Sequence, residues 1–155
     1  MDVVINASPL ILLDKIGRLG VLNKLFDTIY VPRAVLQELQ AIGKEETINL
    51  SDITFHALEI TNKTAVRGLL GRLHIGEVEV IIGAIEENVA TVVLDESAAR
   101  NKAKQLGLQV TGTLGILLRA RKRGLIEDIG HEIEKLKDAG MYLSDKIIKS
   151  ITEKL

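Results

Sequence analysis

The sequence contains no cysteine and no tryptophan, and apart from histidine its aromatic residues are two phenylalanines and two tyrosines. The lack of cysteine excludes disulfide bonds and thiolate metal sites, so any metal ion must be bound by oxygen or histidine ligands. With so few aromatic side chains, base stacking cannot be the main source of affinity for a nucleic acid.

Long apolar runs and an excess of charge are missing as well. No apolar run approaches the roughly 20 residues of a membrane-spanning helix, and the N-terminus lacks the features of a secretory signal. We therefore expect a cytoplasmic protein without membrane contact. The 20 basic and 21 acidic residues give a net charge of −1. A polyanion would have to be held by local patches or through a metal ion.

The N-terminal residues show the pattern around which the fold is predicted. The apolar residues 3–5 lead into Asn6, and Pro9 follows where it can open a helix. This pattern is typical of a buried strand that delivers polar side chains at its carboxyl end. Ligands bind at that edge of open α/β sheets.

Similar β-type runs alternate with helical patterns along the chain. Strands are expected at 3–5, 28–31, 55–60, 91–94 and 108–110, and helices at 9–16, 18–26, 32–41, 64–73, 76–88, 97–106, 113–123, 126–139 and 144–155. The alternation predicts a three-layer α/β fold with a mostly parallel central sheet of four or five strands flanked by helices. The length and the hydrophobic content of 46% suit one domain over 1–155. The C-terminal segment 141–155 carries an apolar stripe that packs either on the core or on a second chain.

Two glutamates lie where a purely apolar helix face is expected. Glu38 interrupts an apolar stripe, and a charge is costly to bury there unless it is paired. It either reaches solvent at the edge of the stripe, pairs with an arginine, or belongs to a site. Glu77 lies on the apolar arc of its helix, whereas Glu79 is expected to point away from it. Glu77 is also in the first turn, where a helix dipole favours an anion, so a capping role is the alternative.

Two further polar residues follow apolar strands directly. Asp95 comes after the run 91–94, as Asn6 comes after 3–5. The alternative role of Asp95 is to cap the helix that follows it. Together, Asn6, Glu38, Glu77 and Asp95 can converge where strands end and helices begin. Three carboxylates in one cleft would repel each other unless a hard cation lies among them, and oxygen ligands suit Mg²⁺ or Mn²⁺.

Basic residues could contact an RNA phosphate at two places. Arg119, Arg121, Lys122 and Arg123 form a run, but they close a helix whose end should lie far from the acids, so a solvated helix end is expected there. Arg100, in the first turns of the helix after Asp95, is better placed.

Five segments in order resemble a known family. They are VINASPLI at 4–11, VPRAVLQEL at 31–39, GEVEVI at 76–81, VLDE at 93–96 and GTLGIL at 112–117. The chain resembles a PIN domain, of the VapC-like branch long catalogued only as a domain of unknown function. The resemblance implies a Rossmann-like parallel sheet and an Mg²⁺- or Mn²⁺-dependent endoribonuclease with acids at the positions of Glu38, Glu77 and Asp95. It further implies homodimers, a small antitoxin partner in toxin–antitoxin systems, and a hydroxyl, here Ser8, beside the first acid.

Asn6 departs from the pattern of the family, whose nucleases generally carry aspartate there. An amide oxygen can coordinate a metal ion but brings no negative charge. The function expected is a metal-dependent ribonuclease of toxin type, with Asn6 as a neutral ligand or hydrogen-bond partner. The alternative is a catalytically weak or inactive PIN fold that binds RNA or protein. A small-ligand-binding α/β domain is a more distant rival, because residues 112–115 lack a Walker lysine or a full dinucleotide fingerprint.

Overall fold

The structure is a computed structural model that describes residues 1–41 and 48–153. Its centre is a five-stranded sheet with the strand order β3-β2-β1-β4-β5, in which every neighbouring pair is parallel. The strands are β1 (Val3–Ile5), β2 (Ile29–Pro32), β3 (His56–Leu58), β4 (Thr91–Val93) and β5 (Gln109–Thr111). The predicted parallel α/β fold is thereby confirmed.

The central strand β1 is short and fully apolar because it is covered on both faces. All three of its residues are inaccessible to solvent, as expected for a strand in the middle of a parallel sheet. Its register pairs Val4 with Tyr30 of β2 and Ile5 with Val93 of β4. The chain leaves β1 for one half of the sheet and returns through β4 to the other half. The carboxyl end of β1 therefore lies where ligands bind in folds of this type.

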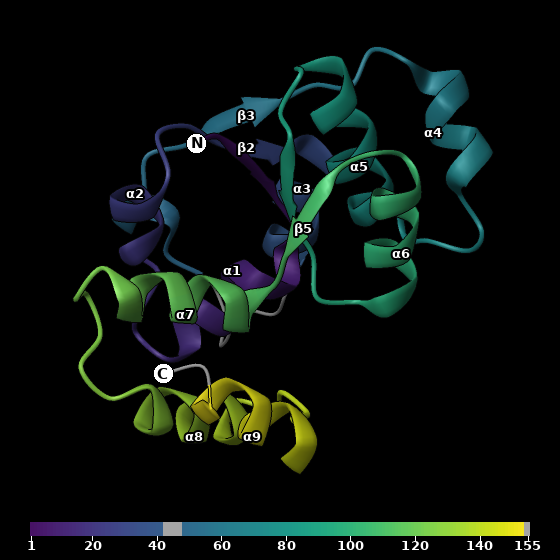
Figure 1. Ribbon diagram of the computed structural model, residues 1–155. Coiled ribbons are helices and arrows are strands. Elements are labelled where there is room, and N and C mark those ends of the chain that lie inside the picture. Colours follow the sequence, from purple (N-terminus) through teal and green to yellow (C-terminus); the bar gives the residue numbers. More distant parts are fainter. Residues whose placement is uncertain (42–47, 154–155) are drawn as a thin grey trace.

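Helices form the two outer layers (Figure 1). Helix α5 packs on β1, β2 and β4 and α6 packs on β5, while α1 and α2 pack on α7 on the other side. Helix α3 contacts both α1 and α5. The bounds of the helices are α1 (Ala7–Lys15), α2 (Val21–Leu25), α3 (Arg33–Ala41), η2 (Leu50–Asp52), α4 (Lys63–Leu69), α5 (Ile75–Glu86), α6 (Ser97–Gln105), α7 (Thr113–Lys122), α8 (Ile129–Asp138) and α9 (Asp145–Glu153).

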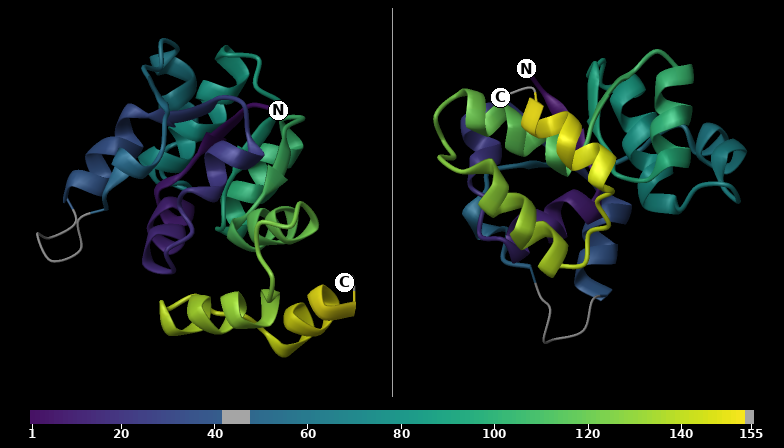
Figure 2. Two further views of the ribbon diagram at one scale, coloured as in Figure 1. Left: turned by 90° about the vertical axis from the view of Figure 1, so that its left-hand side faces the viewer. Right: turned by 60° about the horizontal axis from the view of Figure 1, so that its bottom comes forward.

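The C-terminal helices α8 and α9 lie beyond α1 and α7 at one end of the molecule (Figure 2). Leu143, just before α9, and Ile151 within it are buried in the same hydrophobic cluster as the sheet. Helix α8 is also tied to the loop after α1, because Arg18 donates to Glu132 Oε1 from Nε at 3.0 Å and from Nη2 at 2.6 Å. The C-terminal segment is thus packed on the rest of the chain.

Several expected boundaries differ from the observed ones. Pro32 is the last residue of β2 and not the first of a helix, and the helix expected at 18–26 is only the five-residue α2. Helix α4 ends at Leu69 and not at residue 73, because Gly68 and Gly71 lower the helix propensity of this segment. The last two residues of the helix expected at 144–155 lie outside the described residues. Among the described residues, no helix has the length and apolar character needed to cross a membrane.

Candidate active site

The register of the sheet brings three strand ends to one edge. Ile5 pairs with Val93, and Val93 pairs with Thr111. The residues that follow these strands therefore emerge side by side, with Asn6 after β1, Asp95 after β4 and Thr113 after β5. The sequence alone indicated the first two positions, whereas the third depends on the register of β5.

Asn6 presents a buried oxygen that has no partner among the described residues. Its backbone N–H donates to Val93 O at 3.1 Å, but its side chain makes no capping bond to α1. The Oδ1 atom is buried and unpaired within the described part of the chain. A buried polar atom without a partner lowers the stability of the fold. Capping of α1 therefore does not explain why an asparagine is present at this position.

Glu38 and Asn6 meet at the beginning of α5. A Cβ atom built on Gly76 would lie 3.1 Å from Glu38 Oε2 and 3.2 Å from Asn6 Oδ1. The missing side chain at Gly76 leaves room for both oxygens against the first turn of α5. Glu38 is exposed, as expected if it reaches solvent at the edge of the apolar stripe. Its carboxylate also faces the start of the neighbouring helix α5.

Glu77 has one oxygen in a cap and one without a partner. The Oε1 atom accepts a hydrogen bond from the backbone N–H of His74 at 3.0 Å, which is the capping role considered for this residue. The Oε2 atom is buried and has no partner within the described residues. The cap therefore accounts for half of this carboxylate, and the other half is available to a ligand.

Glu79 was expected to point away from the apolar side of α5, and this prediction is wrong. It is buried, and its Oε1 atom accepts a hydrogen bond from the backbone N–H of Ala34 at 2.9 Å. Ala34 is in the first turn of α3, where backbone donors lack partners within the helix. Glu79 thus holds the start of the helix that carries Glu38, and it is a positioning residue that periodicity did not identify.

Asp95 does not cap the helix that follows it, which was the alternative for this residue. The N-cap position of α6 is Glu96. The Asp95 carboxylate instead accepts hydrogen bonds from the backbone N–H of Thr113 at 2.8 Å and from its hydroxyl at 2.7 Å, at the start of α7. Ser8 Oγ lies 3.5 Å from Asp95 Oδ2. Asp95 is therefore oriented from β5 and α7, through a residue that was not predicted.

Arg100 lies beside Asp95 and bonds to the backbone. Its Nη1 donates to Leu94 O at 2.7 Å. A Cβ atom on Gly112 would lie 2.9 Å from that nitrogen and 2.8 Å from Asp95 Oδ1. Glycine at 112 is thus required for the close approach of β5 to both side chains.

Two of the candidate acids, Glu38 and Asp95, line cavities that the C-terminal segment also lines, whereas Glu77 lines neither cavity. One cavity of about 410 Å³ includes Ser8, Glu38 and Asp95, together with Met141 and Tyr142 between α8 and α9. A second cavity, of about 480 Å³, includes Asp95, Arg100 and the same two C-terminal residues. Tyr142 is 86% exposed. Met141 and Tyr142 were not predicted as site residues, since only the docking of α8 brings them to the sheet.

The basic run that ends α7 lies away from this edge, as predicted. Helix α7 begins beside Asp95 and leads from it toward Arg123. The N-terminal ammonium of Met1 donates to Asp27 and lowers the pKa of that carboxyl, and the charge of Arg123 lowers it further. Asp27 precedes β2, so Arg123 lies near the amino ends of the strands.

The donor chemistry of the cleft fits a hard divalent cation. Asn6 Oδ1 and Glu77 Oε2 are buried oxygens without partners in the described part of the chain, and Glu38 Oε2 lies at the glycine that Asn6 also approaches. Within residues 1–41 and 48–153, no three His, Asp or Glu side chains are gathered closely enough to hold an ion by themselves. Mg²⁺ is commonly bound through one or two carboxylates while it keeps several waters. The oxygens of Asn6, Glu38 and Glu77 therefore suit an Mg²⁺ ion that keeps part of its water shell.

Comparison with known proteins assigns the chain to a family. Residues 2–155 match the sequence model of DUF3368, described as a PIN domain. The protein therefore belongs to this PIN-domain family, as the five segments predicted. A search of curated proteins found no match. PIN domains are generally nucleases that use divalent metal ions.

Gly76 offers a direct test of the space at the cleft. Alanine should leave the free energy of unfolding nearly unchanged, because the removal of up to about 1 kcal/mol of helix cost offsets the small shift forced on the buried Asn6, and the exposed Glu38 can move aside. The new methyl group would displace Glu38 or Asn6, and we expect about tenfold weaker Mn²⁺ binding. Isothermal titration calorimetry with Mn²⁺ measures the effect, and thermal unfolding is its control. Unchanged affinity would contradict a site at this glycine.

Proposed function

We propose that this protein is a metal-dependent endoribonuclease whose ion is bound by Asn6, Glu38, Glu77 and Asp95. The observation that carries the proposal is the approach of Asn6 Oδ1 and Glu38 Oε2 to Gly76, the residue before Glu77, whose buried Oε2 has no partner within the described residues. Buried oxygens of this kind are retained against stability. Membership in the PIN-domain family gives the same function class.

Mg²⁺ or Mn²⁺ bound by these oxygens would supply the charge that activates water and stabilises a phosphodiester undergoing cleavage. The side chains of the protein would hold the ion in place and accept the proton of the attacking water. Glu77 is fixed by its bond from His74 and leaves Oε2 able to accept a proton or a cation. Asp95 is held in one orientation by the two bonds from Thr113. Glu38 is exposed and can adjust to the ligand.

Ser8 and Arg100 are the residues proposed to contact the substrate. Ser8 Oγ and Asp95 line the same cavity as Glu38, so a phosphate near the acids would come within reach of the hydroxyl. Arg100 lines the neighbouring cavity with Asp95. A guanidinium at this place would offset the charge of a phosphate next to the carboxylates.

The experiment is cleavage of a labelled single-stranded RNA of mixed sequence by the purified protein. We expect cleavage with Mn²⁺ or Mg²⁺ and none after EDTA treatment. The absence of cleavage with either ion, or cleavage that persists in EDTA, would contradict the proposal.

Replacing Asn6 by aspartate should strengthen the metal site. A carboxylate about 4 Å from a divalent ion contributes about 2 kcal/mol even at the dielectric constant of water, so we expect Mn²⁺ affinity to rise more than tenfold. Without metal, the added charge lies beside Glu38, and the melting temperature should fall and recover when Mn²⁺ is added. Calorimetry and thermal unfolding measure both effects.

The same variant distinguishes the ribonuclease from a non-catalytic binding module. If the wild-type protein cuts no RNA with Mn²⁺ and the Asn6→Asp variant does, the asparagine has abolished the activity. The wild-type protein is then a non-catalytic binding module. If both cut, with the variant saturating at lower Mn²⁺ concentration, the wild-type chain is an enzyme. Equal Mn²⁺ affinity of the two proteins would exclude Asn6 from the metal site.

We further propose that the ribonuclease acts as the toxin of a toxin–antitoxin system. The family resemblance supports a toxin that is inhibited by a small antitoxin protein and that forms a homodimer. Light scattering of the purified chain tests the dimer, and a monomer at micromolar concentration would contradict it.

A further inference from the structure

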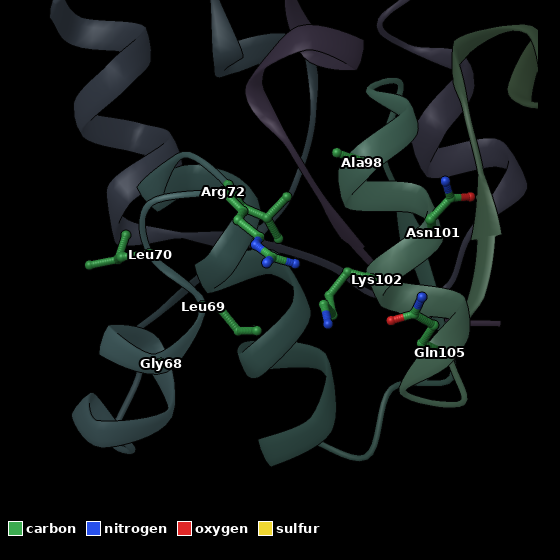
Figure 3. A pocket seen from close by; sticks show the side chains of 9 residues that line it. Gly68, Leu69, Leu70, Arg72, Ala98, Asn101, Lys102 and Gln105 are labelled. Atoms are coloured by element: carbon green, nitrogen blue, oxygen red, sulfur yellow. The ribbon is translucent and has the colours of Figure 1, made fainter.

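We call the candidate site of Asn6, Glu38, Glu77 and Asp95 the acidic cleft. Outside it, the described residues form a pocket that is lined by two cations and by none of the acids among them. It has a volume of about 510 Å³ and lies between α6 and the segment that joins α4 to α5. Arg72 comes from the joining segment and Lys102 from α6. Figure 3 shows the two side chains extending toward one another across the gap from opposite walls. We call this pocket the basic groove.

The two walls of the basic groove differ from the rest of the chain in charge. Residues 61–76 contain Lys63, Arg67 and Arg72, and α6 contains Arg100, Lys102 and Lys104, with no acidic residue in either segment. The whole chain has a net charge of −1, so these segments are locally basic, and two of their six cations, Arg72 and Lys102, line the groove itself. Within the described residues, neither Arg72 nor Lys102 takes part in an ion pair. Their charges are available to a ligand.

Helix α4, whose last residues line one wall of the basic groove, is anchored at its start by α5. Glu86, near the end of α5, accepts hydrogen bonds from the backbone N–H groups of Thr61 and Asn62, directly before α4. Burial alone would raise the pKa of Glu86, but these bonds and the charge of Lys63 lower it below its usual value. The carboxylate therefore stays charged at neutral pH and fixes the start of α4.

One end of the basic groove adjoins the acidic cleft. Leu73, in one wall, directly precedes the turn that leads to Glu77, and Ala98, in the other wall, lies three residues after Asp95. A chain lying in the groove would therefore reach the carboxylates at this end. Asn101 and Gln105 add amide groups to the lining, and Leu69 and Leu70 add apolar surface.

We propose that the basic groove binds the phosphodiester backbone of single-stranded RNA next to the segment held at the acidic cleft. Arg72 and Lys102 each contact a backbone phosphate, and no aromatic platform is needed because charge supplies the affinity. That the ligand of the groove is RNA rests on the proposed function. Binding is measured apart from cleavage, so the two proposals can fail separately.

The test uses the double variant Arg72→Gln with Lys102→Gln and a fluorescein-labelled single-stranded RNA of 20 nucleotides. Fluorescence anisotropy is measured in EDTA over a series of salt concentrations. Each phosphate contact to a single strand contributes about 0.7 to the slope of log affinity against log salt. We expect the slope to decrease by about 1.4 and the dissociation constant at 0.1 M salt to rise about 25-fold. Single-stranded DNA of the same sequence should show the same loss, since the contacts go to phosphates.

The matched control is Arg119→Gln with Lys122→Gln, which removes the same two charges from exposed positions at the far end of α7. A second variant, Arg72→Lys with Lys102→Arg, keeps both charges and should bind RNA like the wild-type protein. The inference is overturned if the double variant binds like the control, or if RNA alone loses affinity and DNA does not. Failure of the wild-type protein to cleave RNA would refute the proposed function and leave this result standing.

Discussion

Replacing Glu77 with glutamine is expected to lower Mn²⁺-dependent RNA cleavage by more than about 100-fold, because even partners outside the ligand shell change metal sites by about 10–100-fold. The glutamine keeps a carbonyl oxygen that can accept the hydrogen bond from His74 N–H. It replaces the unpartnered Oε2 by an amide group without charge. The hydrogen bond that caps α5 should therefore be kept, whereas the metal site loses a charged ligand. Single-turnover cleavage of labelled RNA measures the rate.

Glu87→Gln is the matched control for this variant. Glu87 is exposed and follows the last turn of the same helix, so the same change there should leave the cleavage rate and the melting temperature unaffected. Cleavage by the Glu77→Gln variant at the wild-type rate would contradict the assignment of Glu77. A low rate accompanied by a collapsed melting temperature would show that the carboxylate is a structural cap.

Replacing Arg18 with methionine should reduce the free energy of unfolding by about 3 kcal/mol, the lower end of the range for a broken buried ion pair. The loss has a clear cause, because Glu132 is only 1% exposed and Arg18 makes both of its hydrogen bonds to one oxygen. Lys135, at 3.6 Å, would remain as a weaker partner. Urea unfolding at neutral pH measures the change.

Two further variants separate the ion pair from packing. Glu132→Gln leaves the charge on Arg18, which is about one-third exposed, and should cost less than Arg18→Met. The double variant Arg18→Met with Glu132→Leu removes both charges and should come close to the wild-type stability, as for other buried pairs replaced by apolar residues. A double variant as unstable as Arg18→Met would show that the charges are not the cause.

The ion pair also predicts how the effect depends on pH. Burial alone would raise the pKa of Glu132, but the hydrogen bond and charge of Arg18, with Lys135, lower it below the ordinary value of 4.5. A lowered pKa in the folded state gives stability that is present above the ordinary value and is lost as pH falls through the lowered one. In Arg18→Met, burial dominates and the glutamate is easier to protonate. The difference between the two proteins should therefore shrink below pH 4.5.

The sequence was informative about the fold because its strands are buried on both faces. Continuous runs such as residues 3–5 and 91–94 have few alternatives to a central parallel strand, and four of the five strands fall within one residue of the expected positions. The expected helix at 18–26 was too long, since apolar spacing alone did not indicate that the chain turns at Gly17 and Gly20 and forms only α2. Leu19 and Phe26 lie outside α2 and are buried all the same.

The candidate site was only partly accessible from the sequence. Positions directly after strands are fixed by local pattern, so Asn6 and Asp95 could be placed at one edge in advance. Thr113, Glu79 and Tyr142 act across the fold, because their contacts depend on the register of β5, on the packing of α3 against α5 and on the docking of α8. Such contacts leave no periodic signal in a single sequence.

The most direct test of the metal site is a crystal of the wild-type protein soaked in Mn²⁺, with data collected to show the anomalous signal of manganese. The proposal predicts one strong peak at the cleft, among the side-chain oxygens of Asn6, Glu38, Glu77 and Asp95. A peak elsewhere with an empty cleft, or no peak at Mn²⁺ concentrations that support RNA cleavage, would contradict it.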